Sequence, residues 1–170
     1  MKYTLSVLVE NQHGVLSKVS GLFSRRGFNI DSLAVGETEN SKISCITIVV
    51  DGDEHIIEQV EKQLNKAIPV IKVRNLTKHG SFLSCELALI KVSCNHTQRR
   101  EIMQIAAAMH AKVVDVATSS LTLQIAASSD HIEALTNLLH PYGIRERVCT
   151  GTIAMEKGAV RSKSKSSSDA

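Results

Sequence analysis

Hydrophobic and polar positions alternate at the start of the chain and then recur every three to four residues. Alternation over residues 3–9 places Leu5, Val7 and Val9 on one face, which predicts a β-strand. Over residues 15–26 the apolar positions have helical spacing: Val15, Leu16, Val19, Leu22 and Phe23. Arg25 and Arg26 suit the negative end of a helix dipole, and Gly27 can adopt the left-handed C-cap conformation. The chain therefore opens with a strand followed by an amphipathic helix.

The pattern up to residue 77 completes a strand–helix–strand–strand–helix–strand order. Residues 31–35 and 43–50 predict a hairpin, and Asp51 or Asp53 can cap a helix. That helix has apolar positions at Ile56, Ile57, Val60 and Leu64. Pro69 then opens a strand over residues 70–76. Two crossovers and a hairpin predict a four-stranded sheet with both helices on one face, the ferredoxin-like βαββαβ fold.

The segment TKHGS at residues 77–81 is typical of a linker, and the same order then restarts. We expect a strand over 85–94, a helix capped by Thr97, a hairpin of 113–116 and 121–127, and a helix capped by Asp130. A last strand runs from Ile144 towards Ile153. The predicted fold class is α+β, with two tandem ferredoxin-like βαββαβ domains at residues 1–77 and 82–155. The halves share little residue identity, so duplication stays open.

Charge is concentrated at the C-terminal end. Beyond residue 156 four basic residues face only Asp169, which accounts for the whole net charge of +3. We predict a disordered Lys/Ser tail at 156–170, serving as a solubilising terminus or touching nucleic acid or acidic surfaces. No apolar run approaches the ~18 residues of a membrane span, and the opening lacks a signal-peptide core. A cytoplasmic location is the default expectation.

The chain lacks the usual marks of catalysis or metal binding. The four cysteines form no CxxC pair and lie in apolar segments, which predicts buried free thiols. Cys94 and His96 could be half of a metal site, but no second pair completes it. No nucleophile and base share a motif, so we expect no catalytic residue and no metal site.

The stretch ENQHGVL at residues 10–16 precedes the first helix and has the chemistry of an anion site. Free N–H groups at a helix N-terminus attract a carboxylate, and Gly14 lets a ligand approach the backbone of Val15 and Leu16. Asn11 can both donate and accept, so it suits an amino acid ligand. The structural alternative is a plain turn, in which Asn11 bonds its own backbone and Gly14 supplies a positive φ. Spacing leaves both open.

The opening LSVLVENQHGVLSKVSGLFSRRGFNIDSL resembles an ACT domain, and specifically the start of the regulatory (small) subunit of acetolactate synthase, also called acetohydroxyacid synthase. The match departs mildly at Lys18, where Arg is common. DGDEHIIEQVEKQLNKAIPVIKV resembles the end of the same ACT domain, and VVDVATSSLTLQIAASSDHIEAL the family's C-terminal domain. The resemblance covers about residues 1–155.

The resemblance implies a non-catalytic subunit that activates a large catalytic subunit and confers feedback inhibition by valine or another branched-chain amino acid. The effector would lie between two ACT domains of a homodimer, held at Asn11, Gly14 and Asn29, with Val15, Leu16 and Ile30 adjacent. His13 holds a variable rim position, with pH sensing as the alternative. No cofactor is expected in this chain; thiamine diphosphate, Mg²⁺ and FAD are expected in the catalytic partner.

Three other functions are open to the fold. A free-standing ACT amino-acid sensor with a different partner is the nearest. An independent enzyme is disfavoured because no catalytic motif is present. A nucleic-acid binder is disfavoured because the body is neutral and carries only three Phe and two Tyr. A membrane role is likewise not expected.

Overall fold

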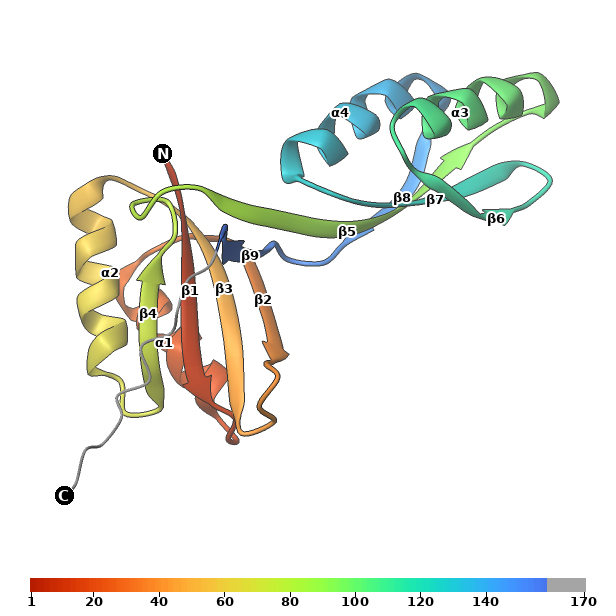
Figure 1. Cartoon of the computed structure of the whole chain (residues 1–170). Coiled ribbons are helices and arrows are strands. Elements are labelled where there is room, and N and C mark those ends of the chain that lie inside the picture. Colours follow the sequence, from red (N-terminus) through yellow and green to blue (C-terminus); the bar gives the residue numbers. More distant parts are fainter. Residues whose placement is uncertain (159–170) are drawn as a thin grey trace.

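The computed structural model describes residues 1–158 and shows two units joined by one long strand (Figure 1). The first unit comprises β1 (Lys2–Glu10), α1 (Val15–Arg26), β2 (Ile30–Glu37), β3 (Ile43–Asp51), α2 (Glu54–Lys66) and β4 (Val70–Asn75). Its four strands are antiparallel neighbours in the order β2-β3-β1-β4. The predicted βαββαβ arrangement of the first half is confirmed.

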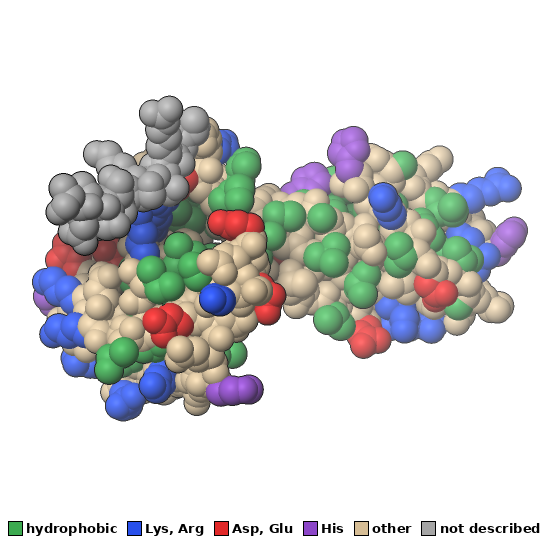
Figure 2. All heavy atoms as spheres, turned by 60° about the horizontal axis from the view of Figure 1, so that its bottom comes forward, with side chains coloured by type: hydrophobic (Ala, Val, Ile, Leu, Met, Phe, Trp, Pro, Cys, Tyr) green, Lys and Arg blue, Asp and Glu red, His purple; other side chains and the backbone are tan. Residues whose placement is uncertain are grey.

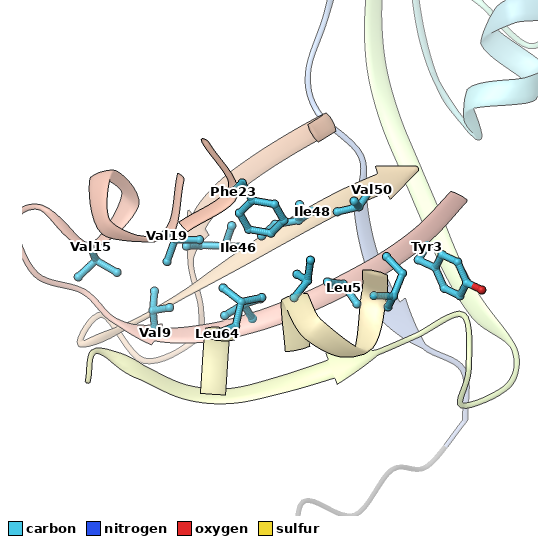
Figure 3. Packing of buried hydrophobic residues seen from close by; sticks show 13 residues of the cluster. Tyr3, Leu5, Val9, Val15, Val19, Phe23, Ile46, Ile48, Val50 and Leu64 are labelled. Atoms are coloured by element: carbon cyan, nitrogen blue, oxygen red, sulfur yellow. The ribbon is translucent and has the colours of Figure 1, made fainter. Parts of the chain in front are cut away.

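One face of this sheet packs on both helices and forms the first core. The register pairs Leu5 with Ile48 and Val7 with Ile46, and all four side chains are fully buried. Phe23 of α1 projects onto these strands, as Figure 3 shows. Each such side chain contributes about 1.5–3 kcal/mol when removed from water, so the alternation seen in β1 is what fixes its inward face.

Both ends of α1 use glycines with positive φ. Gly27 has φ 69° as predicted, and the N–H groups of Gly27 and Phe28 donate to the carbonyls of Ser24 and Phe23. Gly14 precedes the helix with φ 79° and ψ 0°. At α2 the N-cap is Asp53, whose carboxylate accepts from the Ile56 N–H at 2.9 Å. Of the two aspartates expected as caps, Asp53 takes the role.

The second unit repeats the plan with one added strand. It comprises β5 (Phe82–Ser93), α3 (His96–Ala108), β6 (Lys112–Val116), β7 (Ser120–Ala127), α4 (Ser129–Leu139), the 3-10 helix η1 (His140–Tyr142), β8 (Ile144–Cys149) and β9 (Ile153–Glu156). The strands follow the order β6-β7-β5-β8, with β9 on β5 as well. A separate core of buried side chains includes Ile90 of β5, Ile102 of α3 and Leu135 of α4. The second βαββαβ order is confirmed.

The caps predicted for the two helices of this unit are wrong. The N-cap of α3 is Asn95, two residues before Thr97, and it forms a reciprocal capping box with Gln98. Asn with Gln three positions later satisfies two backbone donors at once, which Thr97 could not do from inside the helix. The N-cap of α4 is Ser128, and Asp130 lies in the first turn, where its charge suits the helix dipole.

The expected last strand is divided, and the strand expected from Cys85 begins three residues earlier. β8 pairs with the later part of β5, whereas β9 pairs with its start, from Phe82 opposite Glu156 to Cys85 opposite Ile153. A twelve-residue strand is long enough to take two successive partners on one edge. Of the tail predicted at 156–170, Glu156 belongs to β9 and residues 159–170 lie outside the described residues.

The cysteine prediction holds only in part. All four thiols are free, but only Cys94 is buried; Cys45 and Cys85 are half-buried and Cys149 is exposed. Cys149 lies in a strand whose residues from Arg145 onward are all exposed, which the apolar neighbours in sequence did not reveal. Within residues 1–158 no cluster of three metal-ligating side chains occurs and no helix is long and apolar enough to cross a membrane.

Candidate effector site

Asn11 connects the turn before α1 to the end of β2. Its side-chain amide donates to Glu37 Oε1 at 3.1 Å and to the carbonyl of Ser41 at 2.9 Å. Its backbone N–H donates to the carbonyl of Lys42 at 2.8 Å. Both amide hydrogens are therefore used, which leaves the side-chain oxygen to face a ligand. The alternative in which Asn11 bonds its own backbone is not what the structure contains.

The N-terminus of α1 presents donors without acceptors. The first helical N–H that meets a backbone carbonyl is that of Lys18, which donates to Gly14. Gly14 provides no side-chain cap and the first turn has no acidic residue. In the described chain the N–H groups of Val15, Leu16 and Ser17 thus have no protein partner. Three aligned donors at the positive end of a helix dipole are suited to a carboxylate.

Gly14 leaves the approach to these donors open. A Cβ built at this position meets no atom within 4 Å, so the space above the turn is empty. Its positive φ disfavours most other residues. The plain-turn alternative expected Gly14 to supply a positive φ, and the structure confirms that feature. An open backbone and a strained conformation occur together here, so the turn can be structurally required and also accessible to a ligand.

The two apolar residues after Gly14 face different surroundings. Val15 is buried in the first core, whereas Leu16 is 43% exposed beside the free N–H groups. Leu16 can therefore contact an aliphatic ligand side chain, and Val15 anchors the start of α1 in the first core. His13 is exposed in the same turn.

Asn29 and Ile30 lie at the opposite end of α1 from the turn. The helix has twelve residues and so spans roughly 18 Å, which separates Asn29 from Gly14 within one chain. Asn29 is exposed, its amide donates to Asp31 Oδ1 at 3.4 Å, and Ile30 opens β2. A single chain therefore does not bring all six predicted residues together: they form two groups, one at each end of α1, which we call the candidate half-sites.

The two half-sites are joined by β2, which is an edge strand. Ile30 begins this strand and Glu37, the partner of Asn11, ends it. Antiparallel pairing of two copies of β2 about a two-fold axis places the start of one strand beside the end of the other. Such pairing would bring Asn29 of one chain next to the Asn11 turn of its partner. The edge position of β2 is what makes this geometry accessible.

Sequence reasoning missed Glu37 and Ser41. Neither is near Asn11 in the chain, and the Glu37 contact spans 26 residues. The only sequence signal for these contacts was the predicted hairpin, whose turn residues come back beside the end of the first strand. The structure thus adds a carboxylate that orients the amide predicted to hold the ligand.

A large hollow lies on the other, helix-free face of the first sheet. It measures about 890 Å³ and is bounded by that face and by the paired strands β5 and β9; Glu37 lines it, but none of the six predicted residues does. Figure 2 shows two lobes joined through a narrower waist, with acidic and basic side chains interspersed over both. The Gly14 turn lies outside this hollow.

The fold and the turn define an ACT-type regulatory module followed by a second ferredoxin-like unit. Residues 5–72 match the family model described as the AHAS small subunit-like ACT domain, and residues 85–158 match that of the small subunit of acetolactate synthase. The chain therefore belongs to the acetolactate synthase small subunit family.

Individual relatives agree over nearly the whole length. The chain is 50% identical over 156 residues to the acetolactate synthase small subunit of Mycolicibacterium smegmatis, covering 92% of this chain and 91% of the relative. It is 46% identical over 158 residues to a probable acetolactate synthase small subunit of Archaeoglobus fulgidus, covering 93% and 98%. The crystal structure of the Thermotoga maritima small subunit superposes with a TM-score of 0.85 at 37% identity, covering 94% of this chain and 99% of that one.

Proposed function

We propose that this chain is the non-catalytic regulatory subunit of an acetolactate synthase and that valine or another branched-chain amino acid binds it as a feedback effector. It would activate a large catalytic subunit in the cytoplasm and make that enzyme sensitive to the effector. Thiamine diphosphate, Mg²⁺ and FAD would belong to the catalytic partner. The observation that carries the proposal is the open N-terminus of α1, with three unpartnered N–H groups beside an oriented Asn11 amide.

The chemistry of that half-site matches a small zwitterion. The helix N–H groups would hold the carboxylate, the Asn11 side-chain oxygen would accept from the ammonium group, and Leu16 would contact the aliphatic side chain. Asn29 and Ile30 of the partner chain would close the site. One methylene changes binding by only about 1–3 kcal/mol, so valine, leucine and isoleucine should all compete to some extent.

The central test compares two substitutions at Gly14. Asp and Asn at position 14 must both adopt the positive φ that the turn requires, and they have nearly the same shape, but only the aspartate repels the effector carboxylate. We expect isothermal titration calorimetry to show valine binding lost in Gly14→Asp and retained, though weakened, in Gly14→Asn. In the reconstituted holoenzyme Gly14→Asp should remain an activator and lose feedback inhibition. Wild-type inhibition by valine in Gly14→Asp would refute the site.

A mixing experiment tests whether the site is shared between chains. Gly14→Asp and Asn29→Ala homodimers should each bind valine poorly. A mixed dimer of the two variants contains one site with both defects and one with neither, so mixing should restore about one site per mixed dimer, which is about half a site per dimer in an equimolar, fully exchanged sample. If each site lay within one chain, mixing would restore nothing. Sedimentation analysis of the wild-type chain, expected to give a dimer, is the accompanying control.

The regulatory partnership has its own test. The purified chain should not convert pyruvate by itself, and it should raise the activity of the large subunit when the two are combined. Activity of the chain alone would replace the proposal with that of an enzyme. Co-purification with a different partner, and none with the large subunit, would favour a free-standing ACT sensor.

A further inference from the structure

The segment at residues 150–152, between β8 and β9, lies against the middle of β2; we call it the interdomain strap. The Thr152 N–H donates to Ser32 Oγ at 2.8 Å, a contact between residues 120 apart in the chain. Ser32 belongs to β2 and the strap follows the second unit. Figure 1 shows β9 behind the first sheet, connected to the second unit by this short link.

Gly151 brings the backbones of the strap and β2 into direct contact. A Cβ at this position would lie 3.0 Å from the Ala34 nitrogen and would overlap the Leu33 carbonyl. Real Cβ atoms do not approach backbone this closely, so any other residue would force the strap and β2 apart. This glycine is thus required for close approach; no left-handed backbone conformation is involved.

The same strap is bonded to the second unit on its other side. Thr152 is 8% exposed, and its hydroxyl donates to Glu86 Oε1 at 2.7 Å. Thr150 and Leu87 exchange two hydrogen bonds, at 2.9 and 3.0 Å. Glu86 and Leu87 both belong to β5, the long strand that joins the two units. A displacement of β2 would therefore act on β5 through the strap.

β2 is also the strand whose two ends carry the half-sites. Ile30 starts it and Glu37 ends it, and the strap touches Ser32, Leu33 and Ala34 between them. The register of β2 on β3 shifts between Ile30 and Ser32, so the ladder is interrupted between the first residue of β2 and the residues that the strap contacts. Leu33 and Ala34 are at the midpoint of β2, about which a two-fold pairing would be symmetric.

We propose that the strap couples the effector site to the second unit, with Gly151, Thr152 and Ser32 as its positioning residues. This inference rests on the proposed function, since it takes the effector to bind at the ends of β2. An effector that favours one position of β2 would shift the strap by its differential affinity for the two positions. The second unit would then present a different surface to the catalytic subunit, and effector and catalytic subunit would alter each other's affinity reciprocally.

A first, ligand-free experiment tests the mechanical link. Hydrogen exchange is measured on the full chain for wild type, Gly151→Ala and Ser32→Ala, with Gly36→Ala as the matched control on β2, because a Cβ at Gly36 meets nothing within 4 Å. Gly151→Ala should speed exchange in β2, and Ser32→Ala should speed exchange at residues 152–156. Gly36→Ala should do neither. Unchanged exchange in both variants would refute the mechanical link between the strap and β2.

A second experiment measures the coupling. Valine should alter exchange at residues 150–156 in wild type, and in Gly151→Ala it should alter β2 alone. Valine affinity of the isolated Gly151→Ala chain should stay within about threefold of wild type, while the effect of valine on affinity for the catalytic subunit falls from the ~5- to 150-fold of typical allosteric pairs towards none. Ser32→Thr, which keeps the acceptor, should restore more coupling than Ser32→Ala.

The outcomes separate the two proposals. Valine that protects β2 in wild type without affecting residues 150–156 would overturn the coupling and leave the effector site standing. A chain that binds no branched-chain amino acid, yet shows the ligand-free changes, would refute the proposed effector and retain the mechanical link. Full feedback inhibition in Gly151→Ala, with β2 exchange raised, would show that the strap is only a structural joint.

Discussion

The side-chain amide of Asn11 donates to Oε1 of Glu37 at 3.1 Å, which joins the turn before α1 to the last residue of β2. The same amide donates to the Ser41 carbonyl at 2.9 Å, so its orientation is set by two acceptors. A ligand at the helix N-terminus would therefore meet the oxygen of this side chain and not its nitrogen.

This contact predicts different results for two substitutions of Glu37. Glu37→Gln keeps an acceptor oxygen for Asn11, so valine affinity should change by less than about threefold, since one neutral hydrogen bond replaces a charge-assisted one. Glu37→Ala removes the acceptor and should weaken valine binding by about 0.5–1.5 kcal/mol, as expected for one net hydrogen bond. Calorimetry on the isolated chain measures both. Equal losses in the two variants would mean that the charge of Glu37, and not its bond to Asn11, matters to the ligand.

The capping box at α3 predicts that Asn95 stabilises the second unit and that Thr97 does not. Asn95→Ala should lower the free energy of unfolding by about 1 kcal/mol, because it leaves backbone donors of the first turn without an acceptor. Thr97→Ala changes an exposed residue inside the helix and should have an effect within about 0.5 kcal/mol. Urea unfolding of the two variants checks the assignment; a larger loss in Thr97→Ala would contradict it.

The packing of Phe23 predicts that its truncation strongly lowers the free energy of unfolding. This side chain is 2% exposed and its ring lies 6.3 Å from that of Phe28 in an edge-to-face arrangement. Phe23→Ala should cost about 3–5 kcal/mol, through lost burial and the cavity that remains. The neighbouring Ser24 is exposed, so Ser24→Ala is the matched control and should change stability by less than about 0.5 kcal/mol. Denaturant titration of both variants measures their free energies of unfolding.

The Tyr142 hydroxyl donates to Glu101 Oε2 at 2.9 Å and links η1 to α3. This hydrogen bond to a carboxylate raises the pKa of Tyr142 above the usual value of a phenol. A folded-state pKa above the unfolded one stabilises the native state below the unfolded pKa, and this contribution is lost as the pH rises through the folded pKa. Wild type should therefore be more stable than Glu101→Gln from neutral pH up to about pH 9, and the difference should vanish at higher pH.

Unfolding curves of both proteins over this alkaline range measure the effect. A spectroscopic titration of the phenol adds an independent readout, because Glu101→Gln should bring the Tyr142 pKa back towards its usual value. A stability difference that persists unchanged at high pH would show that the Glu101 contribution does not depend on the Tyr142 proton.

The sequence alone determined the order of elements as far as β8 and the inward faces of β1 and α1. Alternation in β1 and helical spacing in α1 are local properties of the sequence, and each element buries one face. Periodicity therefore identified Leu5, Val7, Val19 and Phe23 as core residues. Gly27 and Asp53 were found because helix ends depend on residues within one turn. The motif ENQHGVL likewise predicted the turn at Gly14 and the start of α1, because the residues that form a helix N-terminus are neighbours in the chain.

Only the tertiary structure decided how distant segments meet. The bond from Asn11 to Glu37 crosses 26 residues, and that from Thr152 to Ser32 crosses 120. No local pattern encodes either, because each depends on which sheet edge and which turn come together after folding. The same reason explains why the last strand divides into β8 and β9: its two partners are successive parts of β5, and Gly151 between them is required by the backbone of β2.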